Sequence, residues 1–257
     1  MIEIYLYSLV FLVGITTGSF LNTIIYRIPI SLGITVHQET ISIYKPRSFC
    51  PNCKEMIPFY FNIPLLSFIL LKGRCSFCNN KISFSYPLIE LINSIFYLSL
   101  YYIYGLSSEF IFYSLAISLL IPISIIDTKF KIIPNSLSYS LLGIGLVFSI
   151  ANSHLLFVDS LIAATAGFLV FYLISVMYMF FKNEEGLGIG DAKLLAAISS
   201  FVGFQNIPII LLITSIVGIC LGLIFYINKK NKTGFLKSSI PLAPSMMVSF
   251  VFILFIS

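Results

Sequence analysis

The sequence has 257 residues, of which 58% are hydrophobic and only 10% are charged, and its mean hydropathy is +1.02. Because soluble domains carry about 25% charged residues, this composition excludes an ordinary water-soluble fold and indicates a membrane protein. The chain has 15 basic and 10 acidic residues, so the positions of these few charges are its most informative feature. We expect the lipid bilayer as a partner and no nucleic acid.

Eight apolar runs predict membrane-spanning helices, at residues 4–26, 88–104, 109–126, 136–151, 159–181, 191–205, 207–227 and 243–257. At about 20 residues per span, eight helices leave room for one small extramembrane insert. The sixth and eighth runs are short, which predicts tilted or partly shielded helices. We therefore expect an all-α polytopic membrane protein in three parts. These are a first helix in 1–26, a cytoplasmic loop in 27–87 and a membrane domain in 88–257.

The basic residues predict the orientation of the chain. All 15 Lys and Arg residues lie between spans 1 and 2, between spans 3 and 4, around the connection of spans 5 and 6, or between spans 7 and 8. Basic loops are retained on the cytoplasmic side, so we expect both termini outside and the 27–87 loop in the cytosol. Arg27 follows the first apolar run and does not precede it, which favours a retained helix over a cleaved signal peptide.

Four cysteines in the 27–87 loop form two CxxC pairs, Cys50 with Cys53 and Cys75 with Cys78. Two such pairs are typical of closed sites in which four thiolates surround Zn²⁺, and a closed site would make the zinc structural. Two disulfides are the alternative, which a cytosolic location disfavours. Cys220 stands alone in an apolar run and is interpreted as a packing residue.

The stretch from Pro58 to Leu71 is apolar, but it has only 14 residues and is interrupted by Asn62 and Pro64. It is too short for a spanning helix, and we expect it at the membrane interface.

Two aspartates adjoin apolar runs on the side that the basic residues define. Asp127 follows the third run, and Asp191 opens the sixth after Gly186, Gly188 and Gly190. Ionisable groups at membrane depth are costly and indicate a functional site. Two carboxyls held close together cannot both ionise, so one keeps its proton while the other activates water against a peptide bond. The glycines lack Cβ atoms and would let an extended substrate backbone approach.

Simpler interpretations of these acids remain open. Asp191 is a favoured residue for capping a helix, and Asp127 could pair with Lys129 or Lys131. A proton-coupled transporter could use an acid pair as a relay, although the acids lie at one face and the sequence shows no inverted repeat. A third possibility is a non-catalytic scaffold whose zinc ribbon binds partners.

In order and spacing, the motifs resemble the bacterial type IV prepilin peptidases, which are GxGD-type membrane aspartic proteases. The resemblance rests on residues 18–29, both cysteine pairs, residues 86–91, Asp127 with residues 133–135, and residues 188–195. It implies that Asp127 and Asp191 are catalytic and that Gly188, Gly190 and Lys193 support them.

The resemblance also implies a substrate and a second reaction. Members of this family cut prepilins or pseudopilins after a basic leader, on the cytosolic side of the bacterial inner membrane, for type IV pili or type II secretion. Relatives with four cysteines commonly methylate the new N-terminus with S-adenosylmethionine. By resemblance and position, Gly73, Arg74 and Glu90 are candidates for the methyl-donor site. We also hypothesise that Glu184 and Glu185 attract the basic leader.

Overall fold

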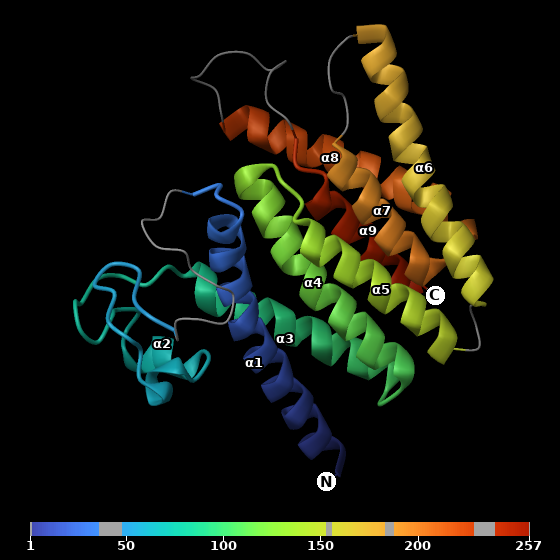
Figure 1. Cartoon of the computed structure of the whole chain (residues 1–257). Coiled ribbons are helices and arrows are strands. Elements are labelled where there is room, and N and C mark those ends of the chain that lie inside the picture. The colour runs from blue at the N-terminus through green and yellow to red at the C-terminus, as the bar shows by residue number, and fades with distance from the viewer. Residues whose placement is uncertain (1, 36–47, 153–155, 183–187, 229–239, 257) are drawn as a thin grey trace. The chain divides into compact units, whose positions relative to one another are not determined.

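The computed structural model describes residues 2–35, 48–152, 156–182, 188–228 and 240–256 (Figure 1). Each of the eight predicted spans corresponds to a helix, which confirms the all-α fold. The helices are α1 (Ile2–Ser31), α3 (Ser85–Tyr104), α4 (Ser108–Phe130), α5 (Asn135–Ala151), α6 (Phe157–Lys182), α7 (Ile189–Val202), α8 (Ile207–Asn228) and α9 (Ala243–Ile256). Among the described residues, α1, α4, α6 and α8 are each long and apolar enough to cross a membrane.

Three short helices complete the described structure. They are the 3-10 helices η1 (Phe59–Asn62) and η2 (Phe204–Asn206), and α2 (Leu66–Leu70). The stretch from Pro58 to Leu71 therefore contains no spanning helix, as its length predicted; its interfacial position stays a prediction. The chain divides into two compact units, Met1–Ser118 and Leu119–Ser257, and α4 begins in the first unit and ends in the second.

In the first unit, α1 and α3 pack backbone against backbone. A Cβ atom at Gly14 would lie 2.6 Å from Cα of Ser94, and one at Gly18 would lie 2.7 Å from Cα of Glu90. Two glycines four residues apart are a common device for bringing membrane helices close together. The α3 residue Asn93 then donates hydrogen bonds to the Gly14 carbonyl and to the Thr17 hydroxyl, both at 2.8 Å.

Helix α1 is longer than the sequence predicted. It continues to Ser31, past the expected end at residue 26, with Pro29 inside its last turns. Arg27 consequently lies within the helix and is only 4% exposed. Of the residues in these extra turns, Arg27 lines the cavity described below.

In the second unit, α7 lies at the centre. Ala192 and every residue from Leu194 to Phe201 are buried, although α7 has only 14 residues. Helix α6 approaches it closely at Gly167, where a Cβ atom would clash with Ser199, and the Ser160 hydroxyl of α6 donates to the Ser200 carbonyl at 2.7 Å. Stacked and edge-to-face rings of Phe148, Phe201 and Phe250 join α5, α7 and α9. The predicted shielding of this short helix is confirmed.

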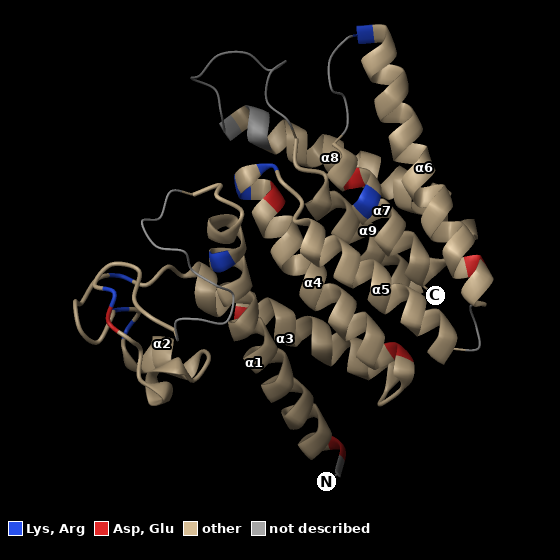
Figure 2. Ribbon diagram, in the orientation of Figure 1, with Lys and Arg blue, Asp and Glu red and all other residues tan. Residues whose placement is uncertain are grey.

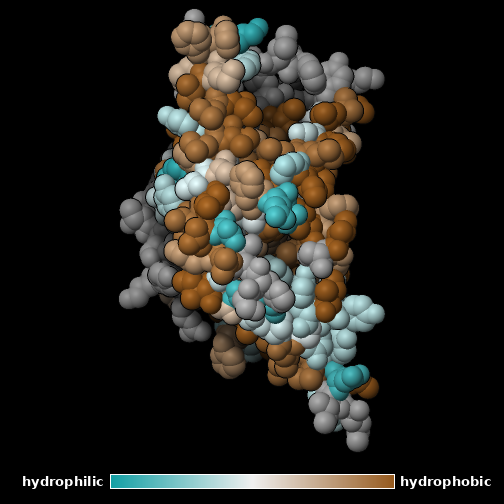
Figure 3. All heavy atoms as spheres, turned by 90° about the vertical axis from the view of Figure 1, so that its right-hand side faces the viewer, coloured by the Kyte–Doolittle hydropathy of each residue, from teal (hydrophilic) through white to brown (hydrophobic). Residues whose placement is uncertain are grey.

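Helix α6 turns a wide apolar surface outward, in contrast to α7. The face of the molecule in Figure 3 is covered largely by hydrophobic side chains. The exposed apolar residues of α6 include Leu169, Leu173, Met177, Phe180 and Phe181. Such a surface is stable only against lipid or protein, in agreement with a membrane-embedded unit.

Candidate functional site

The two predicted aspartates both lie at helix ends in the second unit. Asp127 is in the last turn of α4 and is 5% exposed, whereas Asp191 is in the first turn of α7 and is half-buried. In Figure 2, the acidic residues of the helices stand at or near the helix ends. Asp127 lies within electrostatic range of Asp191, so the fold brings together two carboxyls that are 64 positions apart in sequence.

Each carboxyl accepts a hydrogen bond from a backbone N–H group near the start of a helix. Asp127 Oδ2 accepts from the N–H of Ala243, the first residue of α9, at 3.0 Å. Asp191 Oδ2 accepts from the N–H of Gly188 at 3.2 Å. Gly188, and not Asp191, is the N-cap residue of α7, and Asp191 binds back to it from the third helical position. Lys131 also lies within electrostatic range of Asp127. The helix-start contact of Asp191 and the charge of Lys131 therefore coexist with the proximity of the two carboxyls.

The loop between α4 and α5 packs against the segment that carries Asp191. A Cβ atom at Gly190 would lie 3.1 Å from Cβ of Ile133, tighter than an ordinary contact. Lys193 Nζ donates to Oδ1 of Asn135 at 2.9 Å and lies 5.3 Å from the centre of the Tyr139 ring. The missing side chain of Gly190 therefore makes room for Ile133 of the protein itself, whereas the sequence led us to expect room for a substrate backbone. Glu184, Glu185 and Gly186 lie outside the described residues.

The four cysteines of the two CxxC pairs lie close together in the first unit. Their Sγ atoms are all within 4.8 Å of one another, and those of Cys50 and Cys78 are 3.8 Å apart. All four are free thiols, so neither disulfide of the alternative interpretation is formed. A tetrahedron with Zn–S bonds of about 2.3 Å has edges of about 3.8 Å, so the donor set fits a metal ion of this size.

The two cysteine pairs have the same local backbone. Lys54 and Asn79, which follow Cys53 and Cys78, have positive φ angles of 60° and 56°. The N–H of Lys54 donates to the Cys50 carbonyl at 2.8 Å, and that of Asn79 donates to the Cys75 carbonyl at 3.0 Å. The bridges Phe49–Met56 and Arg74–Lys81 close the two loops. This repeated turn presents two thiols from each loop to a common point.

The electrostatics of the thiols favour a bound cation. The backbone N–H groups of Cys78 and Phe77 lower the pKa of Cys75 to about 7. The N–H of Glu55 lowers the pKa of Cys53, but burial and the other three thiols outweigh it and raise that pKa to about 12. Four thiolates cannot share this space without a positive charge, which a divalent metal supplies.

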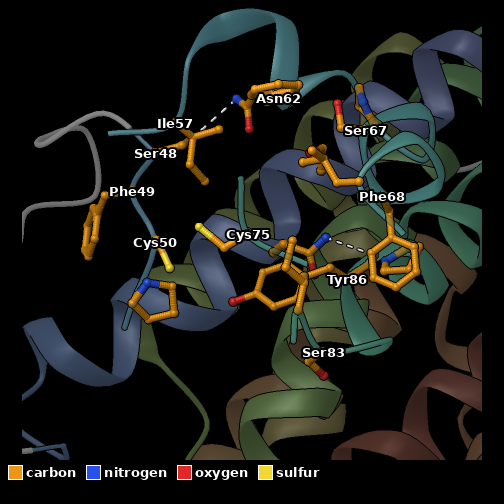
Figure 4. A pocket seen from close by; sticks show the side chains of 18 of the residues that line it. Ser48, Phe49, Cys50, Ile57, Asn62, Ser67, Phe68, Cys75, Ser83 and Tyr86 are labelled. Atoms are coloured by element: carbon orange, nitrogen blue, oxygen red, sulfur yellow. Dashed lines mark hydrogen bonds between the residues drawn. The ribbon is translucent and has the colours of Figure 1, made fainter. Parts of the chain in front are cut away.

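A cavity of about 380 Å³ lies beside the cysteine cluster in the first unit (Figure 4). Its wall includes Ser48, Phe49, Cys50 and Ile57 of the cysteine module, which we define as residues 48–83. The wall also includes Ser83, just before α3, and Tyr86 in the first turn of α3. Of the three residues predicted for the methyl-donor site, only Glu90 lines it. Gly73 packs against the Phe68 ring, and Arg74 is exposed.

Sequence reasoning missed two features of these sites. The first is the N–H of Ala243, a backbone donor that no side-chain pattern reveals. The second is the set of α1 residues that line the cavity, namely Ser19, Asn22, Thr23, Tyr26 and Arg27. These residues lie in the segment 18–29, on which the family resemblance rested. Their spacing places them on one face of an otherwise apolar helix, and this polar face is the sequence signal that could have indicated the cavity.

Comparisons with known proteins agree with this architecture. Residues 12–104 match the bacterial peptidase A24 N-terminal domain, and residues 114–223 match the type IV leader peptidase family. The prepilin leader peptidase/N-methyltransferase of Legionella pneumophila is 34% identical over 263 residues, which cover 95% of this chain and 89% of that protein. The chain belongs to the type IV leader peptidase family.

Other relatives within the type IV leader peptidase family match over similar lengths. The prepilin leader peptidase/N-methyltransferase of Vibrio cholerae is 32% identical and covers 98% of this chain and 97% of its own length. That of Neisseria gonorrhoeae is 30% identical and covers 86% of this chain and 83% of its own length. No solved structure matches the chain significantly.

Proposed function

We propose that this member of the type IV leader peptidase family is a membrane-embedded aspartic endopeptidase. It removes the basic leader of prepilins or pseudopilins and then methylates the new N-terminal residue. The observation that supports the peptidase most directly is the proximity of Asp127 and Asp191, each oriented by a backbone N–H group. No described feature favours a transporter or a non-catalytic scaffold.

In the proposed reaction, one of the two carboxyls is protonated and the other is ionised. The ionised carboxylate takes a proton from water as the water oxygen attacks the scissile carbonyl carbon. The protonated carboxyl gives its proton to the carbonyl oxygen. As the C–N bond breaks, the carboxyl that took the water proton gives it to the leaving amine. The other carboxylate takes a hydroxyl proton from the intermediate, which restores the starting dyad. The N–H groups of Ala243 and Gly188 hold the carboxyls in position during both steps.

The GxGD segment has a supporting role in this proposal. Gly190 allows Ile133 to pack at the start of α7, and Lys193 ties the same turn to Asn135. Both contacts fix the position of Asp191 relative to the end of α4. A misplacement of about 1 Å at a reacting group can lower a rate about 100-fold, so these packing contacts matter for catalysis.

We assign Zn²⁺ to the four-cysteine cluster, with a structural role. Cys50, Cys53, Cys75 and Cys78 would occupy all four positions of a tetrahedral site, which leaves none for a reacting water. The metal would fold the module around the cavity, because the described part of this module contains only short helices and isolated bridges.

The proposed methylation uses S-adenosylmethionine, which supplies a methyl group from its sulfonium. When bound, this cofactor would supply the methyl group to the N-terminal amine of the cut substrate, and residues of the cavity wall such as Glu90 would hold it. This half of the proposal is supported by the names of the relatives and by the presence of a ligand-sized cavity.

For orientation, we propose that the cysteine module and the aspartates face the cytosol of a bacterium. The support is the placement of all 15 basic residues in, or at the helix ends beside, alternate connections. Both termini would then lie on the outer side of the inner membrane. The short basic leader of the substrate would be cut on the cytosolic side.

A reconstituted assay tests both activities. Purified protein in detergent is mixed with a prepilin peptide that has a basic leader, glycine at the cut site and an apolar tail, with and without S-adenosylmethionine. Mass spectrometry should detect the cut product, and a methyl increment only with the donor. Asp127→Asn and Asp191→Asn should each abolish cleavage while the metal content stays at that of the wild type. Cleavage by either variant would refute the dyad.

A further inference from the structure

The cavity of about 380 Å³ in the first unit has no role in peptide hydrolysis as derived above. We propose that it is the binding site of S-adenosylmethionine, with Glu90 beside the sulfonium and Arg27 beside the amino-acid carboxylate. This inference rests on the proposed methyltransferase activity and adds to it the location of the site and the roles of residues in α1 and α3. The volume suits a ligand of this size, since small-molecule sites measure about 300–1,000 Å³.

Glu90 is the acidic residue in the wall of this cavity. It is 7% exposed and lines the cavity. Its Oε2 accepts a hydrogen bond from the N–H of Leu65 at 2.8 Å, and the side chain of Ser19 also hydrogen-bonds to it. These two hydrogen bonds hold the carboxyl group of Glu90 at the cavity wall. A sulfonium cannot donate a hydrogen bond, so its recognition requires a nearby negative charge or the face of an aromatic ring.

The Leu65 backbone is strained for this contact. Its φ of 58° and ψ of −50° are unusual for a residue with a side chain. Such strain persists where the surrounding structure requires it and is concentrated at functional sites. Here the turn at Leu65 both lines the cavity and directs its N–H at Glu90. Glu90 is thereby fixed in place before any ligand binds.

Arg27 places a positive charge in the wall of the same cavity. It is 4% exposed, and it lines the cavity together with Asn22 and Thr23 of the same helix. A guanidinium is suited to the planar carboxylate of an amino acid. A ligand that carries both a carboxylate and a sulfonium matches this pair of charges, which a purely apolar ligand would not.

Aromatic side chains line the cavity as well. Tyr26 of α1 and Phe49 of the cysteine module meet edge to face, with ring centres 6.3 Å apart, and Tyr86 lies at the start of α3. Figure 4 shows Phe49 and Tyr86 on elements that converge on the cysteines. Aromatic rings stack on purines, so these residues provide a surface for the adenine of the donor.

Gly73 and Arg74, the other two residues predicted for the methyl-donor site, affect this cavity only indirectly. Gly73, with φ of +67°, allows the backbone to turn beneath the Phe68 ring, and that ring lines the cavity. Arg74 pairs its backbone with Lys81, which does line the cavity. Their substitution would therefore disturb the wall without removing a contact to the donor.

The charge assignment predicts discrimination between the methyl donor and its product. S-adenosylhomocysteine has the same shape but lacks the positive sulfonium and one methyl group. Loss of a charged contact in a buried site weakens binding about 10- to 100-fold. Glu90→Gln should therefore weaken binding of S-adenosylmethionine by at least about tenfold and that of S-adenosylhomocysteine by less than about threefold. Glu55→Gln is the matched control, because Glu55 is exposed in the same module and is not part of the cavity wall.

A second variant tests the location independently of Glu90. Thr23→Phe places a ring in the cavity and should abolish binding of both nucleosides. Thr16→Phe makes the same change on an exposed position of the same helix and should preserve binding of both. Binding is measured by isothermal titration calorimetry on the purified full chain with its metal. Metal content and prepilin cleavage, which depends on the second unit, report on folding.

The outcomes separate this inference from the proposed function. If the wild type binds neither nucleoside, the methyltransferase half of the proposed function fails together with the site. If the wild type binds S-adenosylmethionine but Thr23→Phe binds it equally well, the location is wrong although the function stands. Equal losses of both nucleosides in Glu90→Gln overturn the assignment of Glu90 to the sulfonium. Selective loss in Glu90→Gln, with both losses in Thr23→Phe, supports the proposal.

Discussion

The hydrogen bond from Ala243 to Asp127 yields the sharpest test of the peptidase site. Ala243→Pro removes the N–H group that donates to Asp127 Oδ2 at 3.0 Å. Because Ala243 is the first residue of α9, where proline is well tolerated, the helix itself should still form. Asp127 is only 5% exposed, so water cannot easily replace the lost donor. A hydrogen bond to a charged group contributes about 1.5–3 kcal/mol, which corresponds to a loss of roughly 10- to 100-fold in kcat/KM.

The assay is cleavage of the prepilin peptide followed by mass spectrometry over a range of substrate concentrations. The loss should appear in kcat with little change in KM, since the N–H positions a reacting group and does not contact the substrate. Ala243→Gly keeps the N–H and should lose no more than about threefold. Thermal unfolding of both variants controls for stability. If Ala243→Pro cleaves as fast as Ala243→Gly, the α9 backbone does not orient Asp127 and this reasoning is refuted.

Three further predictions concern packing, metal and topology. Gly18→Ala places a Cβ atom 2.7 Å from Cα of Glu90 and should lower the free energy of unfolding by about 1–3 kcal/mol in a thermal unfolding assay. The control Gly143→Ala, whose Cβ meets open space, should not lower it. Equal unfolding midpoints for the two variants would contradict the described α1–α3 packing. Chelation should remove one metal ion per chain, make residues 48–83 protease-sensitive and weaken S-adenosylmethionine binding. Protonation competes with the metal at Cys53, whose pKa is about 12, throughout the neutral range, and also at Cys75 below its pKa of about 7. Metal affinity should therefore fall as the pH decreases, and more steeply below about pH 7; pH-independent retention would argue against thiolate ligation. Alkaline phosphatase fused after Ser107 should be active, and fused after Lys131 inactive; the opposite pattern would reverse the proposed orientation.

Composition and charge placement were enough to predict the helices of this fold. A helix that spans a bilayer must satisfy its backbone internally and exclude charge, so apolar runs between basic loops mark it directly. The end of α1 was less accessible. Arg27 was expected to lie after the helix, but the chain buries this arginine and accommodates Pro29 within the last turns. Tertiary packing in the first unit overrode the local signal.

In the candidate sites, too, some residues could be predicted from the sequence and others could not. Asp127 and Asp191 could be singled out because isolated acids beside apolar runs are rare, and the cysteines because their spacing is characteristic. Ala243 could not be singled out, because its contribution is a backbone N–H group that any residue except proline provides. The cavity was equally hidden, since its wall is assembled from α1, the cysteine module and α3.

The shortness of α7 bears on how a hydrolase inside a bilayer obtains water. At 1.5 Å per residue, its 14 residues extend about 21 Å, whereas the hydrocarbon layer is about 30 Å thick. A helix that is buried along most of its length, as α7 is from Leu194 to Phe201, need not span this layer, because other helices and not lipid surround it. At least one end of α7 must therefore stop short of the lipid headgroups. If this is the end that carries Asp191, water for peptide hydrolysis must reach the aspartates through the protein and not through lipid.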